Sequence, residues 1–123
     1  MRRNGQTIIT SPYSPDLYPS NVDCNWLLLA PQGYRLGISF EYFRTSSSDK
    51  LKIYDGSTSY FTRIGEFSGH QSPSDILSST ESLYLEFKSD SRRGKKGFKI
   101  EYRKHKGITK LQYKRIILIF RFN

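Results

Sequence analysis

Few side chains in this sequence could carry out covalent chemistry. The chain of 123 residues has two histidines, His70 and His105, and one cysteine, Cys24. Ser68 lies two residues before His70, but a hydroxyl and an imidazole on one loop supply neither an orienting acid nor an oxyanion hole. The sequence also lacks a glycine-rich phosphate loop and a metal-binding pair of histidines. We therefore expect a protein that is not an enzyme.

The sharpest charge feature is a run of four cations around one glycine. Arg92 and Arg93 precede Gly94, and Lys95 and Lys96 follow it. At the tip of a predicted hairpin, such a run can bind sulfated polysaccharide, an acidic protein surface or phosphate. The alternative is a solvated loop whose charges keep a sheet edge from pairing with another chain.

The net charge of +9 is unevenly distributed. Residues 1–104 carry 15 basic and 11 acidic side chains, whereas residues 105–123 carry 5 basic side chains and no acidic one. Much of the excess therefore belongs to the C-terminal segment, and the pI of about 9.8 is a weak argument for nucleic-acid binding. We expect no nucleic-acid partner.

Alternation of apolar and polar residues predicts the fold. The period is close to two in segments 34–40, 50–53, 83–88 and 98–103, and turn residues separate these segments. Each segment has one apolar and one polar face, as antiparallel strands that cover a core do. The sequence predicts an all-β domain over residues 1–104, built as a two-sheet antiparallel β-sandwich of jelly-roll type.

The chain ends differ from this pattern. Residues 105–123 form a basic and apolar tail whose run 116–120 is too short to span a bilayer. The run is interpreted as an added strand, a membrane-touching segment or a non-native extension. The polar N-terminal residues do not read as a signal peptide, and no segment is long and apolar enough for a transmembrane span.

Several fragments, taken in order, resemble the CUB domain, an extracellular β-sandwich module. The resemblance covers residues 5–103 and implies a CUB-type sandwich that binds proteins outside the cell, as a piece of a larger secreted or receptor protein or as a free-standing relative. The fragments that carry it include Ser11-Pro12-Tyr13-Ser14-Pro15, Asp23-Cys24-Asn25-Trp26, Ala30-Pro31-Gln32-Gly33-Tyr34, Asp49-Lys50-Leu51-Lys52-Ile53-Tyr54-Asp55-Gly56, Leu83-Tyr84-Leu85-Glu86-Phe87-Lys88-Ser89-Asp90 and Gly97-Phe98-Lys99-Ile100-Glu101-Tyr102.

The resemblance also implies two disulfides that this chain cannot form. The first would join Cys24 to an upstream cysteine, which the sequence lacks, so Cys24 is unpaired within the chain. The second would join the loop between Phe43 and Asp49 to the position of Ser68, and neither end is a cysteine. We expect a variant of the family without the second bridge.

A calcium site is the cofactor that the resemblance implies. Its acidic ligands match Asp49 and Asp90, with Ser46 where a third acid would stand, and a basic side chain of a partner protein would insert between the acids. The alternative is that Asp49 begins a strand and Asp90 caps a loop. A second functional hypothesis is a binder of glycosaminoglycan or anionic lipid through residues 92–96 and the basic tail.

Aromatic and thiol side chains complete the expectations. Cys24 and Trp26 are predicted to lie in a buried strand, where a thiol behaves as a small hydrophobe. Five aromatic residues are candidates for contact with a partner at loop tips, but most of them are expected to be packing residues, with Tyr13 and Tyr18 anchoring turns. The five are Tyr13, Tyr18, Tyr54, Tyr60 and Phe61.

Overall fold

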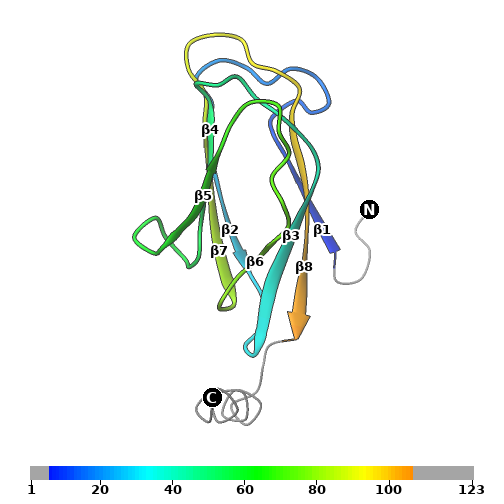
Figure 1. Cartoon of the computed structure of the whole chain (residues 1–123), viewed down its shortest axis with the longest axis vertical. Helices are drawn as coiled ribbons and strands as arrows, with labels where there is room; N and C mark the ends of the chain where they lie inside the picture. Colours follow the sequence, from blue (N-terminus) through cyan, green and yellow to red (C-terminus); the bar gives the residue numbers. More distant parts are fainter. Residues whose placement is uncertain (1–5, 107–123) are drawn as a thin grey trace, which may run out of the picture.

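The computed structural model describes residues 6–106, which form eight strands and no helix. The strands make two four-stranded antiparallel sheets, one ordered β1-β8-β3-β6 and the other β2-β7-β4-β5, and Figure 1 shows the two layers facing each other. The predicted all-β sandwich is confirmed. The strands are β1 (Gln6–Thr10), β2 (Asp23–Leu29), β3 (Tyr34–Arg44), β4 (Lys50–Tyr54), β5 (Arg63–Phe67), β6 (Ile76–Leu77), β7 (Ser82–Lys88) and β8 (Gly97–Lys106).

The core lies between the two sheets and follows the predicted alternation. On β7, Leu83, Leu85 and Phe87 are fully buried, while the intervening residues face outward. Phe87 packs edge-on against Phe98 of β8 with ring centroids 5.1 Å apart, which joins the sheets. Trp26 of β2 meets the same Phe98 ring at 6.0 Å. Each such side chain contributes about 1.5–3 kcal/mol through burial, so a packed core can hold the domain without a disulfide.

The expectations for single residues have mixed outcomes. Tyr18 and Tyr54 are buried, as expected of packing residues, because Tyr18 lies beneath the loops at one end and Tyr54 packs against Tyr84. Cys24 is only half-buried, because β2 is an edge strand. Tyr60 is exposed, as expected.

Strand β8 extends beyond the segment 98–103 that alternation marks. Residues up to Lys106 continue the ladder and pair with the beginning of β3, Lys106 opposite Tyr34. The apolar run 116–120 lies outside the described residues. Within residues 6–106 no helix has the length and apolar character of a membrane span.

Candidate functional site at the loop end of the sandwich

Three connections gather at one end of the sandwich, which Figure 1 shows at the top. They are the β1–β2 connection (residues 11–22), the β3–β4 loop (45–49) and the β7–β8 connection (89–96). Backbone bonds tie them together: the Asn21 amide donates to the carbonyl of Asp90, and the Tyr18 amide donates to the carbonyl of Lys95. We call this region the loop end.

Asp49 is the centre of the loop end. Its side chain is fully buried, and both carboxylate oxygens accept hydrogen bonds. The Tyr18 hydroxyl donates to Oδ2 at 2.6 Å, and the backbone N–H of Asp90 donates to Oδ1 at 2.8 Å. A buried carboxylate is tolerated only when such donors replace water. One side chain therefore joins all three connections.

Asp90 lies beside Asp49 but is more accessible. Its Oδ2 accepts from the Ser48 hydroxyl at 2.5 Å, and its Oδ1 accepts from the backbone N–H of Arg92 at 2.9 Å. The bond from Ser48, followed by that from Arg92, lowers the pKa of the Asp90 carboxyl below its usual value. The structure thus brings the two predicted aspartates together, with Asp90 charged at neutral pH.

Tyr18 is a member of the site that sequence reasoning identified only as a turn anchor. Its ring packs edge-on against Phe87 at 5.1 Å, and its hydroxyl also accepts from the Ser46 amide at 3.1 Å. Burial, assisted by the bond to Asp49, raises the pKa of Tyr18 to about 12. The phenol therefore stays neutral and keeps donating to Asp49. No motif in the sequence pairs residues 31 positions apart.

The oxygen atoms gathered at the loop end are of the kind that a hard cation such as calcium binds, but only two carboxylates supply negative charge. Two carboxylates meet here, and Ser46 contributes its backbone to the loop turn, where its carbonyl accepts from the Asp49 amide at 3.0 Å. Within residues 6–106 there is no group of three or more His, Cys, Asp or Glu side chains arranged to hold a metal. An ionised carboxylate accepts about four bonds, and Asp49 and Asp90 each accept two from described residues, with the Asp49 side chain fully buried.

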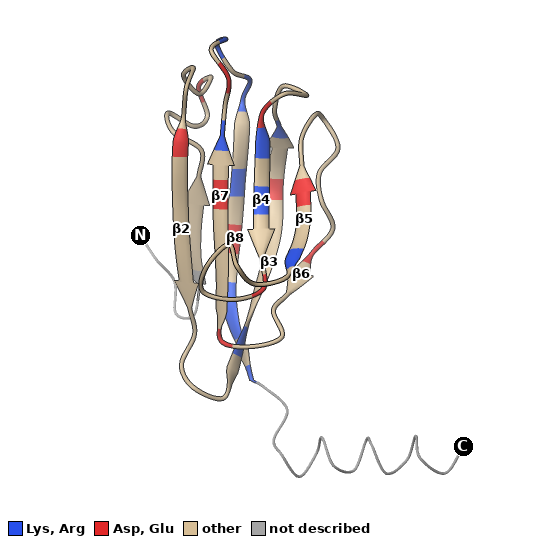
Figure 2. Ribbon diagram, turned by 90° about the vertical axis from the view of Figure 1, so that its left-hand side faces the viewer, with Lys and Arg blue, Asp and Glu red and all other residues tan. Residues whose placement is uncertain are grey.

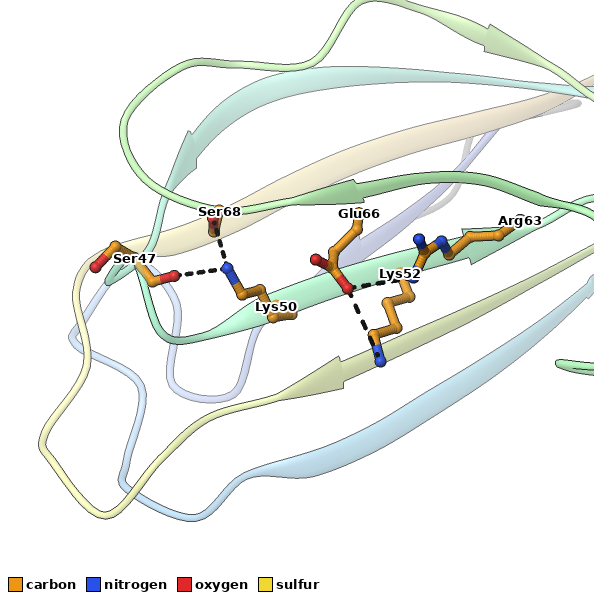
Figure 3. Close-up of polar contacts among 6 residues, drawn as sticks. All are labelled: Ser47, Lys50, Lys52, Arg63, Glu66 and Ser68. Carbon is orange, nitrogen blue, oxygen red and sulfur yellow. Dashed lines mark hydrogen bonds and ion pairs between the residues drawn. The ribbon is translucent and has the colours of Figure 1, made fainter.

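Hydrogen bonds join the two segments that the second family disulfide would link. The Thr45 amide donates to the carbonyl of Gly69 at 2.8 Å, and the Gly69 amide donates to the Thr45 hydroxyl at 3.0 Å. Figure 3 shows Lys50 reaching both the Ser47 carbonyl at 2.8 Å and the Ser68 hydroxyl at 3.4 Å. The β3–β4 loop is thus held to the segment after β5 by polar contacts.

The basic run does not lie at a hairpin tip as predicted. β7 and β8 belong to different sheets, so residues 89–96 cross from one layer to the other. The run is anchored at its centre, because the Gly94 amide donates to the carbonyl of Tyr18 at 3.0 Å and the Tyr18 ring leaves no room for a side chain at Gly94.

The four cations of the run are not equivalent. Lys96 lies over the Tyr42 ring, with Nζ 4.7 Å from the ring centroid, on the side of the sheet that contains β3. Arg92, Arg93 and Lys95 are exposed, and none of them forms an ion pair with another described residue. Three of the four predicted ligand-binding side chains are therefore free to meet an anion.

The neighbouring face of the second sheet mixes charges of both signs. Figure 2 shows basic residues on β4 near the loop end, with acidic residues among them. A groove there contains Asp90 together with Lys50 and Lys88, which are directly opposite each other on β4 and β7. The groove is lined by Ser48, Lys50, Lys52, Glu86, Lys88, Ser89 and Asp90.

These features define a class before any comparison: a two-sheet antiparallel β-sandwich whose charged site is carried by loops at one end. The CUB domain family model matches residues 2–102. The chain belongs to the CUB domain family.

Two similar proteins agree with this assignment. Bone morphogenetic protein 1 of Xenopus laevis is 40% identical over 99 residues, which are 76% of this chain and 14% of that protein. Cubilin of Canis lupus familiaris is 38% identical over 105 residues, 80% of this chain and 3% of cubilin. The chain thus spans a small part of the length of these relatives.

Solved structures are similar throughout the sandwich. The MASP-1 CUB2 domain bound to Ca2+ has a TM-score of 0.71 and 28% identity, with 80% of this chain and 91% of that chain covered. The full extracellular region of zebrafish Gpr126/Adgrg6 has a TM-score of 0.74 and 28% identity, with 83% of this chain and 14% of that chain covered. A CUB domain similar to this one therefore binds calcium.

Proposed function

We propose that this chain is a non-catalytic, extracellular protein-binding module whose contact surface is the loop end. The observation that carries the proposal is the bond between the Asp90 amide and the Asp49 carboxylate, which brings acids from two loops together. Asp90 is the accessible acid of this pair; on anchored loops it can recognise a basic side chain, and the mixed charges around it add selectivity for one partner surface.

Calcium is part of this proposal. Asp49 and Asp90 would hold the ion, which would add positive charge between the two loops and stiffen them. The calcium-bound state of a similar CUB domain supports this assignment. Because two carboxylates are present and Ser46 brings no charge, the affinity should lie near the weak end for extracellular modules, a Kd of about 10⁻⁴–10⁻³ M.

Isothermal titration calorimetry with CaCl2 tests the site. The unmodified chain should take up one ion per chain in the stated range. Asp90→Asn, which keeps the shape but removes the charge, should weaken uptake at least about tenfold, because ligand charge sets affinity in such sites. Asp16→Asn, on an exposed turn residue, is the matched control. The double variant Asp49→Ala with Asp90→Ala should weaken the calcium-dependent binding of a partner protein. Absence of calcium uptake by the unmodified chain would refute the calcium part of the proposal.

A second candidate function is binding of glycosaminoglycan or anionic lipid. The specific observation in its favour is that Arg92, Arg93 and Lys95 are exposed on a backbone anchored at Gly94. Ordered cations gain affinity for a polyanion by releasing its counterions, so binding must fall steeply with salt.

Heparin chromatography separates this candidate from the first. The double variant Arg92→Ala with Arg93→Ala should elute at clearly lower salt than the unmodified chain. Lys104→Ala, on β8 over the Tyr34 ring, removes one exposed cation far along the strand and should shift elution less. Equal elution of all three proteins would reject the candidate, and vesicles with and without phosphatidylserine distinguish lipid from glycan.

A further inference from the structure

The outer face of the second sheet is divided into a charged part and an apolar part. Beside the loop end, the strand register sets Lys88 opposite both Asp23 and Lys50. Toward the other end of the same face, Leu27 lies opposite Tyr84. Figure 2 shows this face, with the charges of β2, β4 and β7 confined to the upper part of these strands. The part of the face away from the loop end is therefore uncharged on three of its four strands.

Large apolar side chains remain exposed in this uncharged part. Leu27 and Leu29 of the edge strand β2 are 49% and 64% exposed. Tyr60 and Phe61 of the β4–β5 connection are 96% and 52% exposed, and Figure 1 shows this connection projecting from the second-sheet side of the sandwich. We call Leu27, Leu29, Tyr60, Phe61 and Tyr84 the apolar patch. Exposed apolar side chains that gather in this way mark an interaction surface.

Hydrogen bonds order the backbone of the β4–β5 connection. The Asp55 amide donates to the carbonyl of Thr62 at 2.8 Å, which closes the connection. The Asp55 carboxylate accepts from the amide and the hydroxyl of Ser79 at 3.0 and 2.7 Å, which ties the connection to the segment before β7. The Phe61 ring packs on Gly56, where a side chain would overlap it. An ordered segment loses little entropy on binding, so this one suits contact with a protein surface.

The cross-strand row between the apolar patch and the loop end alternates in sign. Lys52 of β4 lies opposite Glu86 of β7 on one side and opposite Glu66 of β5 on the other. Asn25 of β2 continues the row beside Glu86. Together with Arg63, which pairs with Glu66 at 3.3 Å, the charges of this region sum to zero. From β2 to β5 the row is thus neutral, negative, positive and negative.

A second copy of the chain fits this row when it is turned about a two-fold axis along the strands. Such a rotation sets the two outer faces against each other and reverses the order of the strands across the face. Between the two middle strands, β7 and β4, Glu86 then lies opposite Lys52 of the second copy, and Lys52 lies opposite its Glu86. Charged groups of opposite sign across an interface favour this orientation over others.

The apolar patch matches itself under the same rotation. β2 and β5 are the two edges of the sheet, so the reversal sets β2 of one copy against β5 and the β4–β5 connection of the other. Leu27 and Leu29 then lie against Tyr60 and Phe61 of the second copy. A two-fold interface requires a surface that is complementary to itself, and this face is so both in its charges and in its apolar side chains.

We propose that the apolar patch and the row of Glu86, Lys52 and Glu66 form the interface of a two-fold symmetric homodimer of this chain. Burial of the patch supplies the driving force, and the charged row selects the orientation. An axis along the strands leaves their direction unchanged, so the loop ends of both copies point the same way. The dimer then offers two loop ends to one partner surface, which raises apparent affinity by avidity. Only this last consequence rests on the proposed function.

Sedimentation velocity of the full chain in EDTA, over a series of concentrations, tests the dimer without a contribution from calcium. The unmodified chain should approach twice its mass of 14.4 kDa as the concentration rises. The paired variant Leu29→Ser with Tyr60→Ser should stay a monomer, because it removes two apolar side chains from the patch. Both residues are exposed, so the fold itself should be little affected. Leu77→Ser, at a leucine that is 54% exposed on β6 of the other sheet, is the matched control and should still dimerise.

Exchange of charges tests the orientation of the two copies. Glu86→Lys places two cations opposite each other across the interface, and Lys52→Glu places two anions there, so each variant alone should be a monomer. Mixed in equal amounts, the two variants should form a heterodimer, because every pair of the middle strands again has opposite signs. Misfolding of a variant cannot produce this rescue.

Four results would overturn the proposal. A monomeric unmodified chain at every concentration would leave the patch to a partner other than a second copy. A dimer that persists in Leu29→Ser with Tyr60→Ser, or one that is equally lost in Leu77→Ser, would lie elsewhere on the molecule. Dimers of either charge variant alone, or a mixture that stays monomeric, would exclude the two-fold arrangement. None of these measurements involves calcium or a partner protein, so their failure leaves the proposed function untouched.

Discussion

Asp49 and the basic run 92–96 lie in the same loop end, and they differ in almost every physical respect. Asp49 is fully buried, and each carboxylate oxygen has a donor. The cations of the run are exposed, and of the four only Lys96 has an aromatic partner. The backbone of the run is nevertheless ordered, because Gly94 and Lys95 bond to Tyr18.

This contrast separates two tasks that a loop residue can perform. The buried acid holds the loops in position, and a loss there should disturb everything it joins. The exposed cations are presented by that arrangement and contribute little to it, since exposed charges change stability only slightly. Substitution of Asp49 should therefore lower the stability of the fold, whereas substitutions in the basic run should weaken binding and leave stability nearly unchanged.

The largest expected effect follows from removing the buried acid. Asp49→Ala leaves the Tyr18 hydroxyl and the Asp90 amide without an acceptor in a buried site, and each orphaned donor costs about 1–3 kcal/mol. We expect a loss of about 2–4 kcal/mol in the free energy of unfolding, measured by urea denaturation. Asp16→Ala, at an exposed residue of the same connection, should change it by less than about 0.5 kcal/mol. Equal effects of the two substitutions would contradict the assigned role of Asp49.

A smaller loss is expected when only the donor is removed. Tyr18→Phe keeps the ring against Phe87 but deletes the hydroxyl that bonds Asp49 and Ser46, at a cost of about 1–2 kcal/mol. Tyr60→Phe, at a tyrosine that is 96% exposed, is the control. If both variants unfold at the same urea concentration as the unmodified chain, the Tyr18 hydroxyl contributes nothing to the free energy of unfolding.

The same tyrosine gives a prediction at high pH. Its pKa rises from 10.0 to about 12 on folding, so its contribution to stability is complete below pH 10 and disappears as the pH rises through 12. In an ultraviolet titration, one tyrosine of the unmodified chain should ionise near pH 12. That step should vanish in Tyr18→Phe, and its persistence there would assign the raised pKa to another residue.

The contact that stands in place of the second disulfide should have an effect of similar size. Thr45→Val keeps the shape of a side chain that is 1% exposed but removes the hydroxyl that accepts from the Gly69 amide. We expect a loss of about 1–2 kcal/mol in the free energy of unfolding, measured by thermal or urea denaturation, because the part-buried Gly69 amide loses its acceptor. Thr58→Val, on the exposed β4–β5 connection, is the matched control. A stable Thr45→Val protein would show that the other contacts of this loop are sufficient.

The smallest expected effect on stability is that of Asp90, the more accessible of the two aspartates. Folding lowers the pKa of Asp90. The stability that this carboxyl contributes is therefore present above its pKa in the unfolded chain, near 4, and is lost as the pH falls through its pKa in the folded chain. The thermal midpoint of the unmodified chain should fall more steeply below pH 4 than that of Asp90→Asn. If the thermal midpoints of the two proteins depend on pH in the same way, Asp90 does not contribute to the loss of stability in acid.

Local pattern was enough to predict the sandwich, whereas the contacts of the loop end required the structure. The alternation of Leu83, Leu85 and Phe87 predicts a strand because burial on one face imposes it. The resemblance to the CUB domain placed Asp49 beside Asp90. The bond between Tyr18 and Asp49 depends on the conformations of two loops, which no periodicity encodes. The crossing of residues 89–96 between sheets was missed because two alternating strands with a turn between them look the same as a hairpin.

The central claim is that the buried Asp49 carboxylate holds the segment that carries Asp90 and the basic run. Amide hydrogen exchange at Asp90, followed by NMR, tests it most directly. In the unmodified chain this amide should exchange at least about a hundredfold more slowly than in an unstructured peptide. In Asp49→Ala it should approach the peptide rate, while the amide of Leu85 in the core strand β7 stays protected. Unchanged protection of the Asp90 amide in a folded Asp49→Ala protein would contradict the account.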